Sequence, residues 1–200
     1  MEAEYTANII ILGAPASGKK SFIRRYCEDI FTDLYDPITE TSGDRRLANI
    51  SGIATLINLE RIPSTFIQSA SEARRIEAEA DALILLYDGS SPESLEELRR
   101  MQLKVLAPEV REGDEARPIA VVASKADLAE AADTDTGTGT GTAWEQGIGE
   151  GSELAVQLGA RFGVTSALWG DGVKDVVEEL AARVLEMKGV EKEVLMGAGS

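Results

Sequence analysis

The sequence has no histidine and a single cysteine, Cys27, among its 200 residues. Without histidine, histidine-based catalytic triads and histidine metal sites are excluded. One cysteine cannot form a disulfide within the chain. No apolar stretch approaches the roughly 20 residues of a membrane-spanning helix. The acidic first residues differ from a basic signal peptide, and no cysteine near the carboxyl end could be prenylated. We therefore expect a cytoplasmic protein without a stable membrane anchor.

Positive charge is also scarce. The chain has 20 Lys and Arg residues against 35 Asp and Glu residues, which gives a formal net charge of −15. No run of basic residues is longer than two. Because binding to nucleic acid depends on clustered basic side chains that neutralise phosphates, we expect no nucleic-acid partner.

Apolar residues are plentiful, at 44% of the chain, although aromatic residues make up only 5%. Short apolar runs alternate with amphipathic segments, which predicts a mostly parallel sheet covered by helices on both faces. The predicted strands are 8–12, two strands within 47–59 that turn near Ser51 and Gly52, 82–87, 119–124 and 161–165. The predicted helices are 19–31, 69–80, 92–106, 153–158 and 173–187.

Residues 129–151 break this alternation with repeated Thr and Gly. Such a segment has little apolar surface to bury, so we predict a mobile surface loop. Trp144 lies within it, and two interpretations are open: it folds back on the body, or it anchors a partner. We expect one domain over residues 1–190, with this loop inside it, and a flexible tail over residues 191–200.

A glycine-rich motif follows the first predicted strand. Residues 13–19 read Gly-Ala-Pro-Ala-Ser-Gly-Lys, which matches the phosphate-loop pattern, and a helix is predicted to begin at its end. Glycine lets successive backbone N–H groups face phosphate oxygens, and a lysine can reach the outer phosphates. The motif predicts that nucleotide phosphates contact Gly13, Ala16, Ser17, Gly18 and Lys19, and the next two residues, Lys20 and Ser21, are further candidate nucleotide-binding residues.

From Asn8 to Met187 the chain resembles the Ras superfamily of small GTPases. The resemblance rests on the phosphate loop and four further motifs in the expected order: Phe31, Tyr35-Asp36-Pro37, Ser124-Lys125-Ala126-Asp127 and Thr165-Ser166-Ala167. It implies a P-loop NTPase of Ras-like α/β fold, with a six-stranded, mostly parallel sheet. It also implies GDP or GTP as the ligand, and protein effectors or assembly partners that meet the switch regions.

The resemblance places guanine recognition on Phe31, Ser124, Lys125, Asp127, Ser166 and Ala167. A carboxylate at Asp127 accepts hydrogen bonds from the guanine N1–H and its exocyclic amine, which adenine does not offer. The stem of Lys125 covers one ring face, and the backbone N–H of Ala167 donates to the guanine O6. Ser124 replaces the Asn of the family and loses an amide contact, which predicts weaker binding by about 1 kcal/mol.

The departures from the family cluster around magnesium. The position of the metal-binding hydroxyl holds Lys20, whose ammonium repels a cation, and Ser21 lies one residue farther along the helix. The first-switch Thr aligns with Ile38, with Thr39 adjacent, and Glu60 takes the place of the second-switch Asp. Thr39 and Glu60 remain as weak candidate ligands. We hypothesise that Lys20 replaces the metal, near the phosphates or paired with Glu60.

The residues for hydrolysis depart as well. Pro63 stands where the family has a Gly that donates its backbone N–H to the third phosphate, and proline has no N–H. Ser64 stands at the position of the water-orienting Gln, so no catalytic residue is assigned. We therefore expect a divergent small GTPase that binds guanine nucleotide with weak or absent hydrolysis and impaired magnesium binding.

Three alternatives remain open from the sequence. A pseudoGTPase without nucleotide would serve as a protein-interaction scaffold, and Lys20, Pro63 and Ser124 favour it. A working switch would use Thr39 and Glu60 as unusual ligands. A small-metabolite kinase would keep the phosphate loop, but the base-recognition motif argues against it.

Overall fold

The computed structural model describes residues 2–32, 42–64, 70–105, 117–129 and 140–190. Its sheet has the order β2-β3-β1-β4-β5-β6, in which β2 is antiparallel to β3 and the other neighbours are parallel. The strands are β1 (Tyr5–Leu12), β2 (Ser42–Ile50), β3 (Ile53–Arg61), β4 (Ala82–Asp88), β5 (Ile119–Ser124) and β6 (Arg161–Val164). The α/β fold with a six-stranded, mostly parallel sheet is confirmed.

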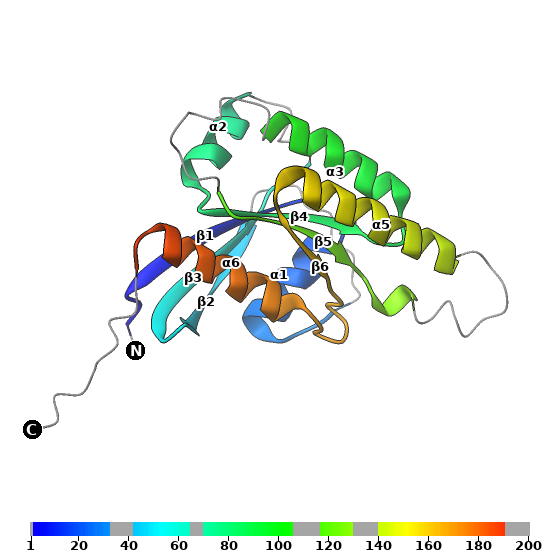
Figure 1. Ribbon diagram of the computed structural model, residues 1–200. Coiled ribbons are helices and arrows are strands. Elements are labelled where there is room, and N and C mark those ends of the chain that lie inside the picture. Colours follow the sequence, from blue (N-terminus) through cyan, green and yellow to red (C-terminus); the bar gives the residue numbers. More distant parts are fainter. Residues whose placement is uncertain (1, 33–41, 65–69, 106–116, 130–139, 191–200) are drawn as a thin grey trace, which may run out of the picture.

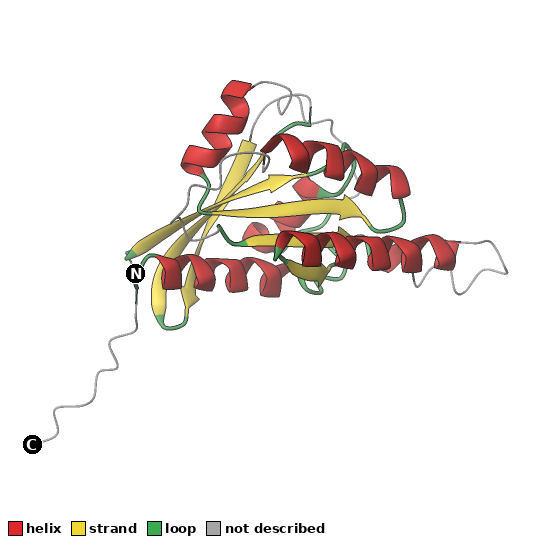
Figure 2. Ribbon diagram, turned by 45° about the horizontal axis from the view of Figure 1, so that its top comes forward, coloured by secondary structure: helices red, strands yellow, loops and turns green. Residues whose placement is uncertain are grey.

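Helices cover both faces of this sheet, as Figures 1 and 2 show. Helices α1 (Lys19–Glu28) and α6 (Val173–Met187) cover one face. Helices α2 (Ala70–Glu79), α3 (Pro92–Val105) and α5 (Thr140–Leu158) cover the other. The central strands β1 and β4 contribute side chains to both apolar clusters, which explains the continuous apolar runs over 9–12 and 82–87.

Several predicted boundaries move in the structure, and β1 begins at Tyr5 rather than Asn8. Helix α1 ends at Glu28 rather than Phe31, because Asp29 adopts a left-handed conformation with φ of 57° and donates its N–H to the carbonyls of the last turn. The strands predicted within 47–59 extend to 42–50 and 53–61. Their predicted turn is confirmed at Ser51 and Gly52, where φ is 53° and 92°.

The prediction of a mobile loop over residues 129–151 is wrong for its second half, because α5 begins at Thr140; residues 130–139 lie outside the described ranges. Tertiary contacts hold the glycine-rich first turns of α5 in place. Trp144 packs against the apolar cluster of this face, so the interpretation that it folds back on the body is confirmed. The Tyr87 hydroxyl donates to the Gly147 carbonyl at 2.7 Å. The start of α5 therefore forms a helix because packing stabilises it, although its sequence has low helix propensity.

Two glycines of α5 give a test of this packing. A Cβ at Gly149 would meet no atom within 4 Å, whereas one at Gly147 would lie 2.3 Å from the Gly89 carbonyl oxygen. Gly149→Ala is expected to stabilise the protein by about 0.5–1 kcal/mol, because alanine loses less backbone entropy in a helix. Gly147→Ala is expected to destabilise it through that clash. Urea denaturation measures both, and equal effects of the two substitutions would contradict the packing described.

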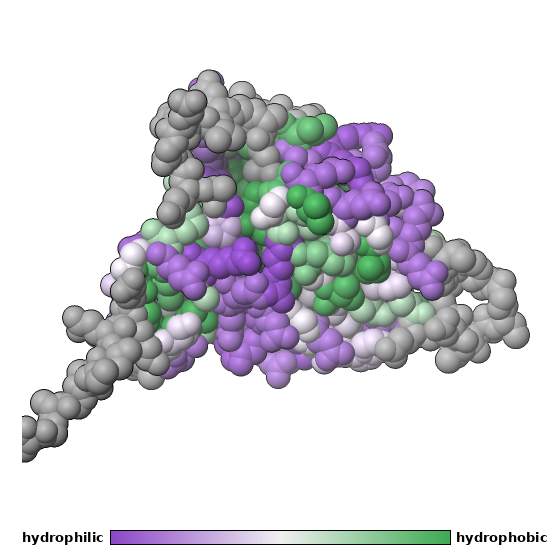
Figure 3. All heavy atoms as spheres, viewed as in Figure 1, coloured by the Kyte–Doolittle hydropathy of each residue, from purple (hydrophilic) through white to green (hydrophobic). Residues whose placement is uncertain are grey.

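The outer surfaces of the helices differ in character. In Figure 3, hydrophilic side chains gather over α3 and α6, while the surface over α5 is paler and includes apolar patches. Val156 of α5 is 79% exposed. Within the described ranges, no helix combines the length and the apolar character needed to cross a bilayer.

Candidate functional site

The residues singled out in the sequence gather where parallel strands end. β1, β4 and β5 end at Leu12, Asp88 and Ser124, and β6 ends at Val164. Since these strands are parallel and adjacent, their carboxyl ends lie along one edge of the sheet. The phosphate loop, the residues after Asp88, and both base-recognition segments start from this edge.

The phosphate loop curls around the ammonium of Lys19. This side chain is 3% exposed, and its Nζ donates to the carbonyls of Gly13 and Ala14, each at 2.7 Å. Burial lowers the pKa of Lys19 to about 8; nearby Glu97 opposes this shift and Arg61 adds to it. Ala16 has φ of 58° and Gly18 has φ of 90°, so the loop takes two left-handed turns before α1. A buried cation is thereby fixed at the amino-terminal end of a helix, as an anionic ligand requires.

Ser124 joins the phosphate loop to the sheet. Its Oγ lies 2.8 Å from the Ser17 carbonyl and 2.8 Å from the Tyr87 carbonyl. A hydroxyl has one proton, so it donates to one of these oxygens at a time, where an asparagine amide has two protons to give. Ser124 thus retains a link to the phosphate loop at reduced capacity. The Ser17 Oγ is buried without a hydrogen-bond partner among the described residues.

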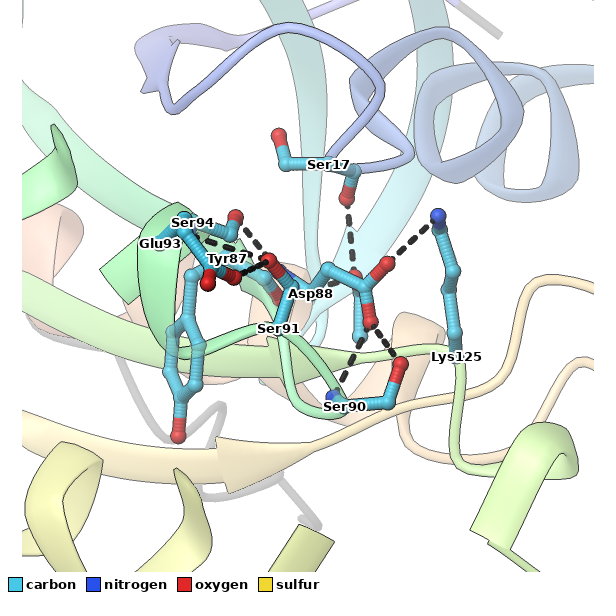
Figure 4. Close-up of polar contacts among 9 residues, drawn as sticks. Ser17, Tyr87, Asp88, Ser90, Ser91, Glu93, Ser94 and Lys125 are labelled. Carbon is cyan, nitrogen blue, oxygen red and sulfur yellow. Dashed lines mark hydrogen bonds and ion pairs between the residues drawn. The ribbon is translucent and has the colours of Figure 1, made fainter. Parts of the chain in front are cut away.

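Lys125 is held by an acidic residue that the sequence analysis missed. Its Nζ pairs with Asp88 Oδ2 at 2.7 Å, and the other oxygen of Asp88 accepts from the backbone and hydroxyl of Ser90. Figure 4 shows Asp88 between Lys125 and Ser90, below Ser17 of the phosphate loop. The available signal was an acidic residue at the end of an otherwise apolar strand. This ion pair fixes the Lys125 side chain. The backbone of Lys125 is left-handed, with φ of 65°.

The second base-recognition segment contacts the first. The Ser166 hydroxyl donates to Asp127 Oδ1 at 2.5 Å, and the backbone N–H of Ala126 donates to the Thr165 carbonyl. Asp127 has no further hydrogen-bond or ion-pair partner among the described residues. One carboxylate oxygen is therefore fixed while the other can accept from a base, which is the chemistry that guanine needs.

The carbonyls of the same segment are held by Arg25 of α1. Its Nε donates to the Ala167 carbonyl at 2.7 Å and its Nη2 to the Leu168 carbonyl at 2.9 Å. The sequence analysis did not identify Arg25, because nothing local links it to a segment more than 140 residues away. It ties the helix that begins at the phosphate loop to the base-recognition segment.

Comparison with known proteins places this arrangement in a family. The model of the Ras family matches residues 8–186. The chain belongs to the Ras family. It is 26% identical to the Ras-related protein Rab-21 of Geodia cydonium over 193 residues, which are 92% of this chain and 73% of that protein. It is 26% identical to the GTP-binding protein Di-Ras2 of Pongo abelii over 172 residues, 86% of this chain and 78% of that protein.

The match to the GTP-binding protein Rhes of Mus musculus is partial. It has 29% identity over 105 residues, which are 52% of this chain and only 38% of that protein. Family membership confirms the resemblance to Ras-like small GTPases that the motifs predicted. It supports a Ras-like GTPase.

The described ranges of this Ras-family protein also include Phe31, a predicted base-binding residue, and Leu168. Phe31 follows the end of α1 and is half-buried, and Leu168, after the Thr-Ser-Ala motif, is 43% exposed. The Tyr-Asp-Pro motif and Thr39 lie outside the described residues. The structure therefore brings together the phosphate loop and the Ser124, Lys125, Asp127 and Ser166 positions, and leaves the first switch undescribed.

The residues around the expected metal do not fit magnesium in the way usual for the family. Lys20 places an ammonium, rather than a hydroxyl, at the second position of α1, and Ser21 beside it is half-buried. Glu60 pairs with Arg75, Nη2 to Oε1, at 2.8 Å. Within the described ranges, no three Asp, Glu, Cys or His side chains gather closely enough to hold a metal ion. After β3, at the end of the described range 42–64, Pro63 is buried and Ser64 is half-buried.

Proposed function

We propose that this Ras-family protein binds GDP and GTP, hydrolyses GTP weakly or not at all, and depends little on magnesium. The observation that carries the proposal is the joined pair of subsites: a buried Lys19 in the phosphate loop and Asp127 with one oxygen fixed by Ser166. Ser124 connects the two through the Ser17 carbonyl. The residues proposed to recognise phosphate and base therefore lie along one edge of the sheet.

Weak hydrolysis follows from the residues at the second switch. Pro63 offers no backbone N–H to a third phosphate, and Ser64 is too short to orient water as a glutamine does. Because a switch requires contacts that differ between the two nucleotides, the loss of this N–H also weakens discrimination between GDP and GTP.

We propose that the protein acts in the cytoplasm through protein partners that meet the region around the nucleotide.

A second function is favoured by one feature of the site. The ammonium of Lys19 already has two carbonyl partners at 2.7 Å, and the carboxylate of Glu60 already has Arg75. Charges that would otherwise await a phosphate and a metal are thus satisfied by the protein. This favours, as the alternative, a pseudoGTPase that binds no nucleotide and serves as a scaffold for other proteins.

Nucleotide analysis separates these functions. The freshly purified protein is denatured and any released nucleotide identified, and then GDP, GTP and ADP are titrated in magnesium and in EDTA. We expect guanine nucleotide to bind equally well in both solutions, with affinities for GDP and GTP within about tenfold, or 1.4 kcal/mol, and ADP to fail as the control. Absence of any guanine-nucleotide affinity would favour the scaffold, and strict dependence on magnesium would contradict the proposed metal independence.

A further inference from the structure

The second-switch helix α2 is attached to the sheet by an arginine that the family resemblance does not explain. Arg75 lies in the middle of α2, and its guanidinium contacts three carboxylates. Its Nη2 is 2.8 Å from Glu60 at the end of β3 and 2.7 Å from Glu72, and its Nη1 is 2.7 Å from Glu79. The contacts with Glu72 and Glu79 lie within α2, whereas the contact with Glu60 joins the helix to the sheet.

Glu60 is the residue that corresponds to the metal-facing Asp of the second switch. Its register partner on β1 is Ile10. Ile10 lies two residues before Leu12, where β1 ends and the phosphate loop follows. Its side chain is 30% exposed, and that of Arg75 is 29% exposed, so water screens this pair only in part. The three carboxylates raise the pKa of Arg75, whose charge is permanent in any case.

Two other contacts hold α2 in the same position. Ile76, beside Arg75 in sequence, is fully buried in the apolar cluster that also contains Ile10 and Ile62. Arg117, just before β5, donates to the carbonyls of Ile76 and Glu77 near the end of α2. Cationic donors at carbonyls near a helix carboxyl terminus stabilise that terminus. The described part of α2 is thus fixed to the sheet by an ion pair, an apolar side chain and a terminal arginine, all from the protein itself.

We propose that Arg75 takes the electrostatic place of magnesium at Glu60, and so holds α2 in one position whether nucleotide and metal are bound or not. The guanidinium neutralises the carboxylate that would otherwise face the ion. Its contact with Glu60 joins β3 to α2 directly, and its contacts with Glu72 and Glu79 fix the guanidinium within the helix. The comparison with magnesium rests on the proposed nucleotide site, whereas the attachment of α2 does not.

Hydrogen exchange of the nucleotide-free protein tests the attachment. Arg75→Gln removes the charge and the fork, and Arg74→Gln removes the same charge from an exposed neighbour on the same helix. Exchange of the amides in α2 is expected to be about tenfold faster or more in Arg75→Gln, because hydrogen bonds to charged groups are the strong ones. Arg74→Gln should match the wild type, and Arg75→Lys should restore protection in part. Equal exchange in Arg75→Gln and Arg74→Gln would overturn the proposal.

Metal affinity tests the comparison with magnesium. Both substitutions are made in a Lys20→Ser background, which removes the repelling ammonium, and Mn²⁺ is titrated into the GDP-bound proteins. Mn²⁺ is expected to bind about tenfold tighter or more to Lys20→Ser/Arg75→Gln than to Lys20→Ser/Arg74→Gln, since only the former frees Glu60. Equal affinities would overturn this role of Arg75. If no variant binds GDP, the proposed function fails, and the exchange experiment still decides how α2 is held.

Discussion

Replacement of Lys19 by methionine is expected to weaken GDP binding by about a hundredfold or more, because charge-assisted hydrogen bonds to phosphate oxygens are lost. The buried ammonium sits inside the phosphate loop and is the described cation best placed to meet phosphates. Methionine keeps the length and apolar volume of the stem, so the loop retains its packing. Isothermal titration with GDP in EDTA measures the loss, and Lys174→Met, at a lysine 66% exposed on α6, is the matched control.

The same lysine gives the binding reaction a dependence on pH. Burial lowers the pKa of Lys19 from 10.5 to about 8 in the free protein, so its charge is lost as the pH rises through 8. Bound phosphates favour the charged form and raise this pKa, so GDP binding takes up protons above pH 8 and affinity falls there. The Lys19→Met variant should lose this proton uptake, which titration in buffers of different ionisation enthalpy reports.

The pH dependence of folding stability has the opposite sign to the pH dependence of GDP affinity. A lysine whose pKa is lower in the folded than in the unfolded protein destabilises the fold while it is charged. This destabilisation is present below pH 8 and is relieved as the pH rises from about 8 towards 10.5. The contribution of Lys19 to the free energy of unfolding of the nucleotide-free protein should therefore increase over that window.

For the binding experiment, a wild-type GDP affinity in the Lys19→Met variant would show that phosphates do not meet this loop.

Replacement of Asp127 by asparagine is expected to reduce GDP affinity by about a hundredfold or more and to create affinity for xanthosine diphosphate. The carboxylate accepts from two N–H donors on guanine, whereas an asparagine amide would face one of them with its own N–H donor. Xanthine carries a carbonyl in place of the exocyclic amine and can accept from that amide. The Ser166 hydroxyl, which donates to Asp127 at 2.5 Å, can still donate to the amide oxygen.

Competition titration of both diphosphates measures this exchange of specificity. Asp171→Asn is the matched control, because the exposed Asp171 side chain lies in the same region while its backbone carbonyl accepts from Ser166. We expect it to keep wild-type preference for GDP. Loss of both diphosphates in Asp127→Asn would indicate that Asp127 only supports the loop, and unchanged GDP affinity would place the base elsewhere.

The sequence by itself determined the sheet, the phosphate loop and the order of the motifs. The unbroken apolar run over 82–87 predicts a strand buried on both faces, and β4 has the side chains of that run fully buried. The motif at 13–19 lies between a strand and a helix as predicted. These features are local, because a short window of sequence contains all the residues that create them.

Tertiary structure decided what local sequence could not. The first turns of α5 have low helix propensity, and they form because Trp144 packs on the apolar cluster and Tyr87 donates to Gly147. Pairing of Asp88 with Lys125 joins residues 37 positions apart, and that of Arg25 with the Ala167 carbonyl joins residues 142 apart. Arg75 likewise reaches Glu60 from another element. Charged side chains find such partners only after the sheet has brought its strand ends and helices together, so the pairs are set by the fold as a whole.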